Sequence, residues 1–299
     1  MTGKDDNVIR RVQEQPAGVL SRLVSVFTFI NRRRPDTRFP VLPVADATLF
    51  AIGGILLIFL AYTFLDARLL AMSRTGRTGA NGFFDLLTHF GQSNWLLWGS
   101  GLGMLALSLR PAFDIHWRLQ PVWHRTFLTL WFIFSSVALS GLLANLFKFI
   151  FGRSRPPFIH DATVWQSDMF RAGYAHASFP SGHATTAGAL AMALGLLFPQ
   201  LRIPVFAACL LIAMTRPILG VHFPSDITAG FLLGMGFTWI WARSFARKQL
   251  LFRFDDRGRI ELRGEGSGAM HRLGDIVLGR KETKRIGNVS SGNGDEKIK

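Results

Sequence analysis

Six long apolar runs alternate with polar segments along the 299-residue chain. A helix needs about 20 apolar residues to cross the hydrocarbon core of a bilayer, within a range of roughly 17–25. Each run is therefore predicted to be a transmembrane helix, although the second, fourth and fifth are at the short end of the range. The fold class that follows is all-α, a polytopic membrane protein with six transmembrane helices. The runs are Asp46–Leu65, Gln92–Leu109, Thr126–Phe147, His183–Pro199, Ile203–Leu219 and Asp226–Trp241.

Polar and basic segments flank the apolar runs and divide the chain into three parts. Residues 1–45 are predicted to form a basic arm, 46–245 a six-helix membrane domain and 246–299 a basic tail. The arm contains GVLSRLVSVFTFI (18–30), which either lies in the membrane interface as an amphipathic segment or is a plain tether. The tail is charged and rich in glycine from Phe252 onwards, so we expect it to be largely flexible.

The net charge of +15 would suggest a nucleic-acid partner if the protein were soluble. Most of the 34 lysines and arginines, however, fall in the arm, the tail and the loops on one side of the six runs. Because basic residues concentrate on the cytoplasmic side of membrane proteins, we predict cytoplasmic termini, contact with membrane lipids and no nucleic-acid partner. The opposite side holds only Arg68, Arg74, Arg77, Lys148, Arg153, Arg155, Arg171 and Arg216.

The predicted outer loops are residues 66–91, 148–182 and 220–225. The first contains NGFFDLLTHF (81–90), which has a helical apolar face. This face indicates a short interfacial helix or, alternatively, the border of a lipid access path. Its residues are Phe83, Phe84, Leu87 and Phe90.

A basic cluster follows the third run in KFIFGRSRPPF (148–158), which carries Lys148, Arg153 and Arg155. Long basic side chains at the end of a span commonly extend to water and anchor it there. Basic residues are nevertheless disfavoured at outer span ends, so the position favours a functional role.

A tight turn begins the fourth run at PSGH (180–183). Pro180 and Gly182 favour the turn, and Ser181 is a predicted N-cap. The N-terminus of a helix offers free backbone N–H groups and the positive end of the helix dipole, which together suit a phosphate group. A helix start alone does not explain an ionisable ring at this rim, whereas His183 is placed to pass a proton to a leaving oxygen.

The fifth and sixth runs meet in TRPILGVHFPSDITAG (215–230). Arg216 lies near the outer end of the fifth run, and an arginine at the bilayer centre costs about 2.5–3.5 kcal/mol, so such residues usually face a polar cavity. Taken separately, Asp226 is a helix N-cap and His222 a polar loop residue. Their spacing of four residues also lets a carboxylate accept the imidazole N–H, which is typical of an activated histidine nucleophile.

Three cations, two histidines and one carboxylate are thus predicted to lie at the same depth on the outer face. We interpret them as a phosphate site in which the cations neutralise phosphoryl oxygens, one histidine attacks and the other protonates the departing oxygen. The histidines and the carboxylate could instead ligate zinc, but three nearby cations repel a metal ion and attract an anion, so no metal and no cofactor is expected. The six residues are Lys148, Arg155, Arg216, His183, His222 and Asp226.

At these residues the sequence resembles the type 2 phosphatidic acid phosphatase superfamily, the lipid phosphate phosphatases, as a bacterial integral-membrane member. The signature of that family is Lys-x6-Arg-Pro, then Pro-Ser-Gly-His, then Ser-Arg-x5-His-x3-Asp. The three motifs occur in this order from Lys148, Pro180 and Arg216, with Thr215 in place of the usual serine. The resemblance covers the third to sixth runs, residues 126–245 of the predicted domain.

The resemblance implies a six-helix core and hydrolysis through a phosphohistidine intermediate without a metal. It assigns His222 as the nucleophile, Asp226 as its partner and His183 as the general acid. The residues that it implies for phosphate binding are Lys148, Arg155, Ser181, Gly182 and Arg216.

The predicted function is therefore a phosphatase that acts on a lipid phosphate or diphosphate at the outer face of the cell inner membrane. Polyprenyl diphosphate, phosphatidylglycerol phosphate, phosphatidic acid and the phosphate groups of lipid A all fit as substrates. Two alternatives stay open, a phosphotransferase that uses another acceptor and a non-catalytic protein that binds or transports phosphate lipids. The sequence sets neither the lipid nor the oligomeric state.

Overall fold

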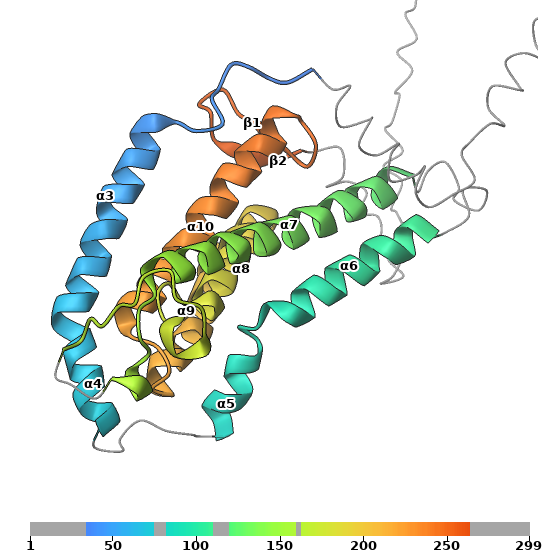
Figure 1. Cartoon of the computed structure of the whole chain (residues 1–299). Coiled ribbons are helices and arrows are strands. Elements are labelled where there is room, and N and C mark those ends of the chain that lie inside the picture. The colour runs from blue at the N-terminus through green and yellow to red at the C-terminus, as the bar shows by residue number, and fades with distance from the viewer. Residues whose placement is uncertain (1–33, 75–81, 110–119, 160–162, 264–299) are drawn as a thin grey trace, which may run out of the picture. The chain divides into compact units, whose positions relative to one another are not determined.

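The computed structural model describes residues 34–74, 82–109, 120–159 and 163–263, and these belong to one compact unit. They are mostly helical (Figure 1). Predictions for residues 1–33 and 264–299 lie outside the described residues, including the segment 18–30 and the flexibility of most of the tail.

Each of the six apolar runs forms a helix. Two helices extend well past their predicted ends, α7 in both directions and α10 at its C-terminus, because helical hydrogen bonding continues where the apolar run stops. The first run forms α3, which continues through a π-helical turn, η1, into α4. The bounds are α3 (Val44–Ala61), η1 (Tyr62–Asp66), α4 (Ala67–Arg74), α6 (Ser93–Leu109), α7 (Gln120–Phe151), α8 (Gly182–Leu197), α9 (Arg202–Ile218) and α10 (Pro224–Arg247).

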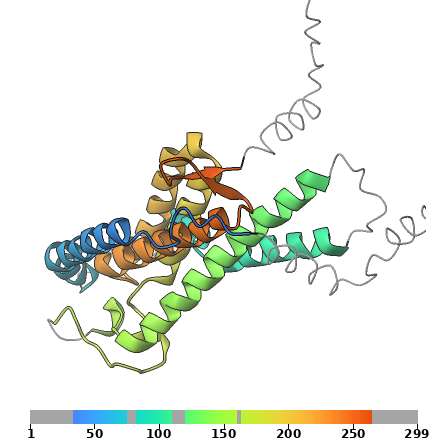
Figure 2. The ribbon, with the colours of Figure 1, turned by 90° about the horizontal axis from the view of Figure 1, so that it is seen from above.

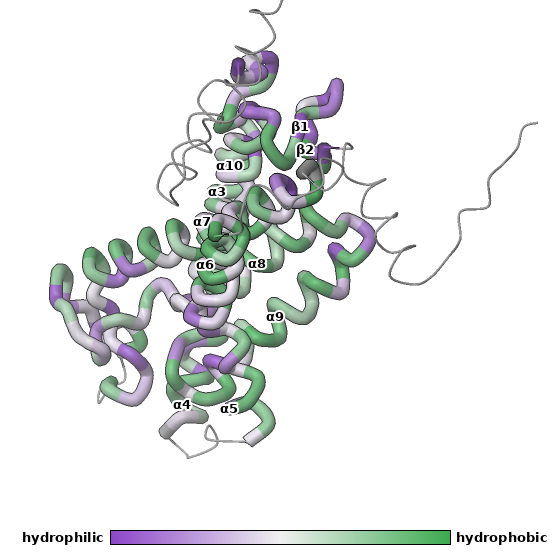
Figure 3. The backbone as a smooth tube through the Cα atoms, turned by 90° about the vertical axis from the view of Figure 1, so that its right-hand side faces the viewer, coloured by the Kyte–Doolittle hydropathy of each residue, from purple (hydrophilic) through white to green (hydrophobic). Residues whose placement is uncertain are grey.

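Within the described part of the chain, three helical segments are long and apolar enough to cross a membrane. They are Val44–Ser73, Val122–Phe151 and Pro199–Ile218, and Gly182–Leu197 is a shorter apolar helix. Apolar residues dominate α9, and polar residues gather near the helix ends and in the loops (Figure 3). Length and composition therefore support a membrane protein, and six crossings remain a prediction.

The closest helix packing is between α8 and α10, which lie side by side (Figures 1 and 2). A Cβ atom at Gly188 would lie 2.1 Å from the carbonyl oxygen of Phe231, and one at Gly234 would lie 2.1 Å from that of Thr185. Small residues allow backbones to approach this closely in membrane helix pairs. The pairing also brings the first turns of α8 and α10 together.

A short antiparallel hairpin follows α10 and pairs β1 (Phe252–Phe254) with β2 (Ile260–Leu262). Phe252 and Phe254 are buried, and the ring of Phe252 lies 5.0 Å from that of Phe132 on α7. The sequence analysis missed this hairpin, which occupies the first residues of the segment expected to be flexible. Its in–out alternation spans three residues, too few to distinguish a strand from a charged tail.

The loop between α7 and α8 is ordered where it is described and contains two short 3₁₀ helices, η3 (Pro156–Phe158) and η4 (Tyr174–His176). Gly152 starts the loop with φ of 55°, and a Cβ atom there would lie 1.7 Å from the carbonyl oxygen of Asp168. Only glycine therefore fits at this position, where the chain folds back from the end of α7.

The remaining short elements are α5 (Gly82–His89) and the 3₁₀ helix η5 (Pro199–Leu201). The helix α5 confirms the prediction of a short helix within residues 81–90. Its exposed large side chains include Phe83 and Leu86, whereas Thr88 is buried. Phe83 belongs to the expected apolar face, whereas the exposed Leu86 does not.

Candidate active site

The predicted site residues meet where α7 and α9 end and where α8 and α10 begin. The backbone N–H of Ser181, which precedes α8, donates to the carbonyl oxygen of Asp226 at 3.0 Å. A Cβ atom at Gly230, one turn along α10 from Asp226, would lie 2.3 Å from the carbonyl oxygen of Ser181. The close packing of the two helices therefore holds the second and third motifs together.

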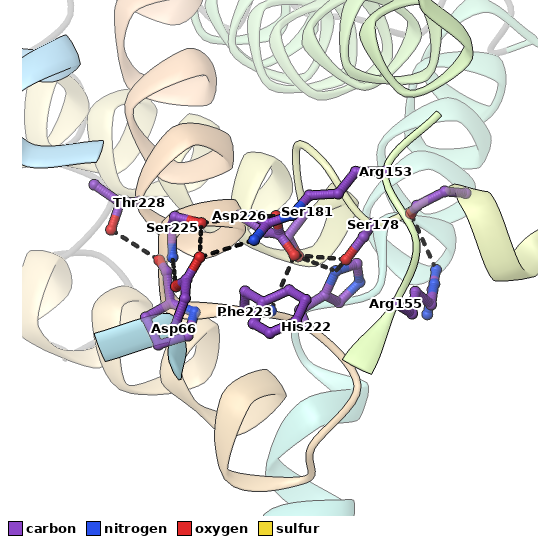
Figure 4. Close-up of polar contacts among 12 residues, drawn as sticks. Asp66, Arg153, Arg155, Ser178, Ser181, His222, Phe223, Ser225, Asp226 and Thr228 are labelled. Atoms are coloured by element: carbon purple, nitrogen blue, oxygen red, sulfur yellow. Dashed lines mark hydrogen bonds and ion pairs between the residues drawn. The ribbon is translucent and has the colours of Figure 1, made fainter. Parts of the chain in front are cut away.

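His222 and Asp226 are both buried at this junction (Figure 4). The Nδ1 atom of His222 lies 3.6 Å from Oδ2 of Asp226, which is longer than a direct hydrogen bond. The hydroxyl of Ser178 lies 3.5 Å from the same Nδ1 and donates to the same Oδ2 at 2.5 Å. His222 and Asp226 are thus at ion-pair distance, with Ser178 beside them. The other ring nitrogen of His222, Nε2, is on the side away from the carboxylate.

The basic residues reach the same junction from three elements. A Cβ atom at Gly182 would lie 3.1 Å from Nζ of Lys148, so this ammonium rests against the first turn of α8. Arg216 donates through Nη1 to the hydroxyl of Thr88 at 3.2 Å. The guanidinium carbon of Arg155 lies 3.8 Å from the ring centroid of Tyr174. The three basic side chains and the two histidines lie close enough to one another for their charges to interact.

Several buried polar atoms at this junction have no hydrogen-bond partner among the described residues. Buried donors are nearly always paired in proteins, so a group of unpaired ones requires an explanation. Most are nitrogens, which suits a ligand rich in oxygen atoms. The atoms are Nε and Nη1 of Arg155, Nε of Arg216, Nε2 of His183 and Oγ of Ser181.

Two hydroxyl residues of the motifs make different local contacts. Ser181 occupies the N-cap position of α8, but its side chain makes no capping hydrogen bond, which leaves the hydroxyl available to a ligand. The hydroxyl of Thr215 donates to the carbonyl oxygen of Ile212 at 2.7 Å. The threonine at this motif position therefore bonds within α9 rather than toward the site.

Burial sets the protonation of the site. Burial lowers the pKa of His222 to about 4, and the neighbouring Asp226 partly offsets this while Arg155 and Arg216 lower it further. Burial also lowers the pKa of Arg155, while Tyr174 and Asp226 favour its charged form. At neutral pH the imidazole of His222 is therefore uncharged and has a free lone pair, whereas the guanidinium is charged.

The described residues contain no group of three or more His, Cys, Asp or Glu side chains arranged to hold a metal ion. In the zinc alternative, His183, His222 and Asp226 would form such a group. At this junction, basic side chains surround the two histidines, and their positive charges suit an anion.

Comparisons with known proteins assign the family. Residues 129–250 match the PAP2 superfamily. A lipid A 1-phosphatase from Rhizobium johnstonii is 38% identical over 177 residues, which cover 58% of this chain and 71% of that protein. A lipid A 1-phosphatase from Rhizobium etli is 37% identical over 185 residues, with 58% and 75% covered. The chain belongs to the PAP2 superfamily.

Two further proteins are similar to this chain. A decaprenylphosphoryl-5-phosphoribose phosphatase from Mycobacterium tuberculosis is 33% identical over 153 residues, which cover 50% of this chain and 71% of that protein. The crystal structure of a transmembrane PAP2 type phosphatidylglycerolphosphate phosphatase from Bacillus subtilis has a TM-score of 0.39 and 19% identity, and covers 66% of this chain and 94% of that one. This structural likeness is too weak to support an argument.

The PAP2 membership and the apolar helices identify the protein as a lipid phosphatase of the membrane, a hydrolase. The matched segment includes the three motifs from Lys148 to Asp226. It leaves out α3, η1, α4, α5 and α6.

Sequence reasoning missed several polar side chains that touch the predicted PAP2 site residues directly or, for Asp66, through Arg153. Asp66 had a detectable signal, since a carboxylate at the end of an apolar run is costly and commonly functional. The others gave none that a single sequence reveals, because hydroxyl and aromatic residues are common in helices and loops alike. The missed residues are Asp66, Thr88, Tyr174 and Ser178, together with the buried position of Arg153.

Proposed function

We propose that the protein removes a phosphate group from a lipid through a phosphohistidine intermediate, without a metal ion. The observation that carries the proposal is the set of unpaired buried donors on Arg155, Arg216 and His183, which converge with His222 at one junction. An anion with several oxygens is the ligand that satisfies them, and a phosphoryl group has that chemistry.

The first step is attack on phosphorus by Nε2 of His222. A P–N bond forms, the P–O bond to the lipid breaks, and His183 gives its proton to the departing oxygen. Lys148, Arg155 and Arg216 neutralise the charge that spreads over the phosphoryl oxygens in the transition state.

The second step regenerates the enzyme. His183, now unprotonated, accepts a proton from water, the water oxygen attacks phosphorus, and the P–N bond to His222 breaks. Inorganic phosphate leaves, and His183 again holds the proton it needs for the next cycle. The hydroxyl of Ser181 and the backbone N–H of Gly182 hold the phosphate in both steps, aided by the N-terminus of α8.

For the substrate, we propose the 1-phosphate of lipid A. This rests on the two Rhizobium relatives, which carry that activity in their names and exceed the mycobacterial phosphatase in identity. Polyprenyl diphosphate, phosphatidylglycerol phosphate and phosphatidic acid are the competitors that a lipid panel must include.

We further propose six membrane crossings, cytoplasmic termini and an active site at the outer face of the inner membrane. The distribution of Lys and Arg supports this orientation. A site at the ends of the helices suits a substrate whose acyl chains remain in the bilayer while its phosphate reaches the polar junction.

The decisive test is phosphate release by the purified full chain in detergent, across the lipid panel, with and without a chelator. We expect the greatest release from lipid A, no effect of chelator and no release by His222→Ala. Strict dependence on an added metal ion would refute the mechanism.

The same preparation distinguishes the two alternatives. A phosphotransferase would yield a phosphorylated acceptor when a candidate lipid or sugar acceptor is present, and less inorganic phosphate. A non-catalytic binding protein would retain its lipid affinity in His222→Ala and release no phosphate in either form.

A further inference from the structure

Arg153 is fully buried next to the proposed nucleophile pair, yet it fills one of the unspecified positions of the first motif (Figure 4). Its Nη1 donates to Oδ1 of Asp226 at 2.6 Å, and its Nη2 donates to Oδ2 of Asp66 at 2.9 Å. The guanidinium carbon lies 4.4 Å from the ring centroid of Trp165 and 4.3 Å from that of Phe223. A buried arginine is costly unless paired, so its two carboxylate contacts fix its position.

Asp66 reaches this arginine from the first helical run, outside the segment that matches the family. It is the last residue of the π-helical turn η1 and is also fully buried. Its Oδ1 accepts the backbone N–H of Ser225 at 3.0 Å, and its Oδ2 accepts the Ser225 hydroxyl. Because both oxygens act as acceptors, Asp66 is bound as the ionised carboxylate and caps a free N–H in the first turn of α10.

Both carboxylate oxygens of Asp226 accept hydrogen bonds within this network. Arg153 occupies Oδ1, whereas Oδ2 accepts from Ser178 at 2.5 Å and from the backbone N–H of Phe223 at 2.9 Å. The same Oδ2 faces Nδ1 of His222 at 3.6 Å. The carboxylate therefore cannot rotate away from the imidazole without breaking the bond to Arg153.

We infer that Asp66 and Arg153 are positioning residues that hold Asp226 toward His222, a role that rests on the proposed phosphohistidine reaction. Neither side chain needs to touch the substrate. The chain of contacts runs from η1, through the loop after α7, to the first turn of α10, and so ties the first helical run to the nucleophile.

Charge balance gives Asp66 a second effect. Two carboxylates and one guanidinium leave one net negative charge, which the imidazole of His222 offsets when it becomes positive on phosphorylation. The other charged and titratable groups that face His222 are Arg155 and Arg216, which disfavour a positive ring, and His183. Removing the charge of Asp66 would leave Arg153 and Asp226 as a neutral pair and would make the ring less basic.

Asp66→Asn tests the inference because it keeps the shape of the side chain and removes its charge. We expect kcat to fall about tenfold with KM unchanged, since the phosphate-binding cations stay in place. NMR of the histidine-labelled full chain should show the pKa of His222 lowered relative to the native protein. Asp168→Asn is the matched control, because Asp168 pairs with Arg171 at 2.8 Å in an exposed position, and it should change neither value.

Arg153→Lys is the second variant and supplies the kinetic readout if Asp66→Asn does not fold. Lysine keeps the charge but lacks the planar fork that bonds two carboxylates at once, so we expect a similar fall in kcat. Arg243→Lys is its control, since Arg243 is a buried arginine that bonds the carbonyl oxygens of Pro40 and Gly258. This control should lower the melting temperature and leave kcat per folded molecule unchanged.

The outcomes separate this inference from the proposed function. Unchanged kcat and unchanged His222 titration in a folded Asp66→Asn protein, even with a lower melting temperature, would overturn the positioning role. If the native protein releases no phosphate from any lipid, the proposed function fails, and the NMR titration alone then decides whether Asp66 acts on His222.

Discussion

Gly182 has no side chain at the point where Lys148 reaches the first turn of α8. The missing Cβ atom would lie 3.1 Å from the ammonium nitrogen, closer than side-chain contacts normally are. The glycine thus keeps a path open between the lysine and the backbone N–H groups proposed to hold phosphate. Gly182 therefore leaves room for the ammonium group of Lys148, and a bend of the chain is not what requires a glycine here.

Gly182→Ala should therefore impair catalysis without lowering the stability of the fold. The flexible end of Lys148 can move aside, and alanine favours a helix by about 0.5–1 kcal/mol, so the melting temperature should not fall. A displaced charge-assisted contact is worth about 1.5–3 kcal/mol, so kcat/KM for phosphate release should drop roughly tenfold or more. Gly99→Ala on α6, where nothing lies within 4 Å, is the control. Equal kcat/KM in the two variants would contradict this role of Gly182.

The residues of the three motifs could be predicted from the sequence because their chemistry limits the choice of side chain and spacing. His222 and Asp226 are four residues apart, so their proximity follows from one turn of chain. Asp66 and Ser225 are 159 residues apart, and their contact depends on how whole helices pack. A single sequence carries no record of that distance, so the supporting contacts could not be predicted.

At the scale of elements, the α8–α10 pair sets the geometry of the site. His183 lies in the first turn of α8 and Asp226 in the first turn of α10. The sequence predicted both helices from their apolar runs, but it did not predict that they pack backbone to backbone. The sequence shows that both runs contain glycines, but it does not show which of these glycines face the other helix.

Gly234→Ala should force this pair apart. The added Cβ atom would lie 2.1 Å from the carbonyl oxygen of Thr185 and 2.7 Å from the backbone nitrogen of Ala189, and backbone atoms cannot move alone. Overpacking of this kind costs typically 1–3 kcal/mol, so thermal unfolding in detergent should occur at a lower temperature, with loss of phosphatase activity. Gly141→Ala on α7, which has open space, should leave both unchanged. A Gly234→Ala protein with native melting temperature would argue against close packing.

At the scale of the whole molecule, α10 runs from the site to the hairpin. Its 24 residues span about 36 Å as a helix, close to the thickness of a bilayer. The loop that carries Met169 and the hairpin loop that carries Arg257 are therefore expected on opposite faces of the membrane. The lone cysteine, Cys209, is buried, so introduced cysteines can be labelled against a silent background.

The proposed orientation predicts opposite labelling of Met169→Cys and Arg257→Cys, both at exposed positions. A membrane-impermeant maleimide added to spheroplasts should modify the first variant and spare the second until the membrane is permeabilised. The native chain should remain unlabelled throughout. The reverse pattern would place the active site on the cytoplasmic face and would refute the topology while leaving the chemistry intact.

The π-helical turn that ends at Asp66 makes the length of the first helical run matter as much as its composition. Hydrogen bonds in a π turn run from residue i to i+5, so the turn accommodates one residue more than an α turn. Deleting a single residue from the regular part of this run, α3, would leave the π turn in place and rotate Asp66 by about 100° relative to the residues before the deletion. The run would still be apolar enough for a bilayer, but the carboxylate would face away from Ser225. Small insertions and deletions here are thus more disruptive than most substitutions, since they change the phase of a membrane anchor that also supports the nucleophile.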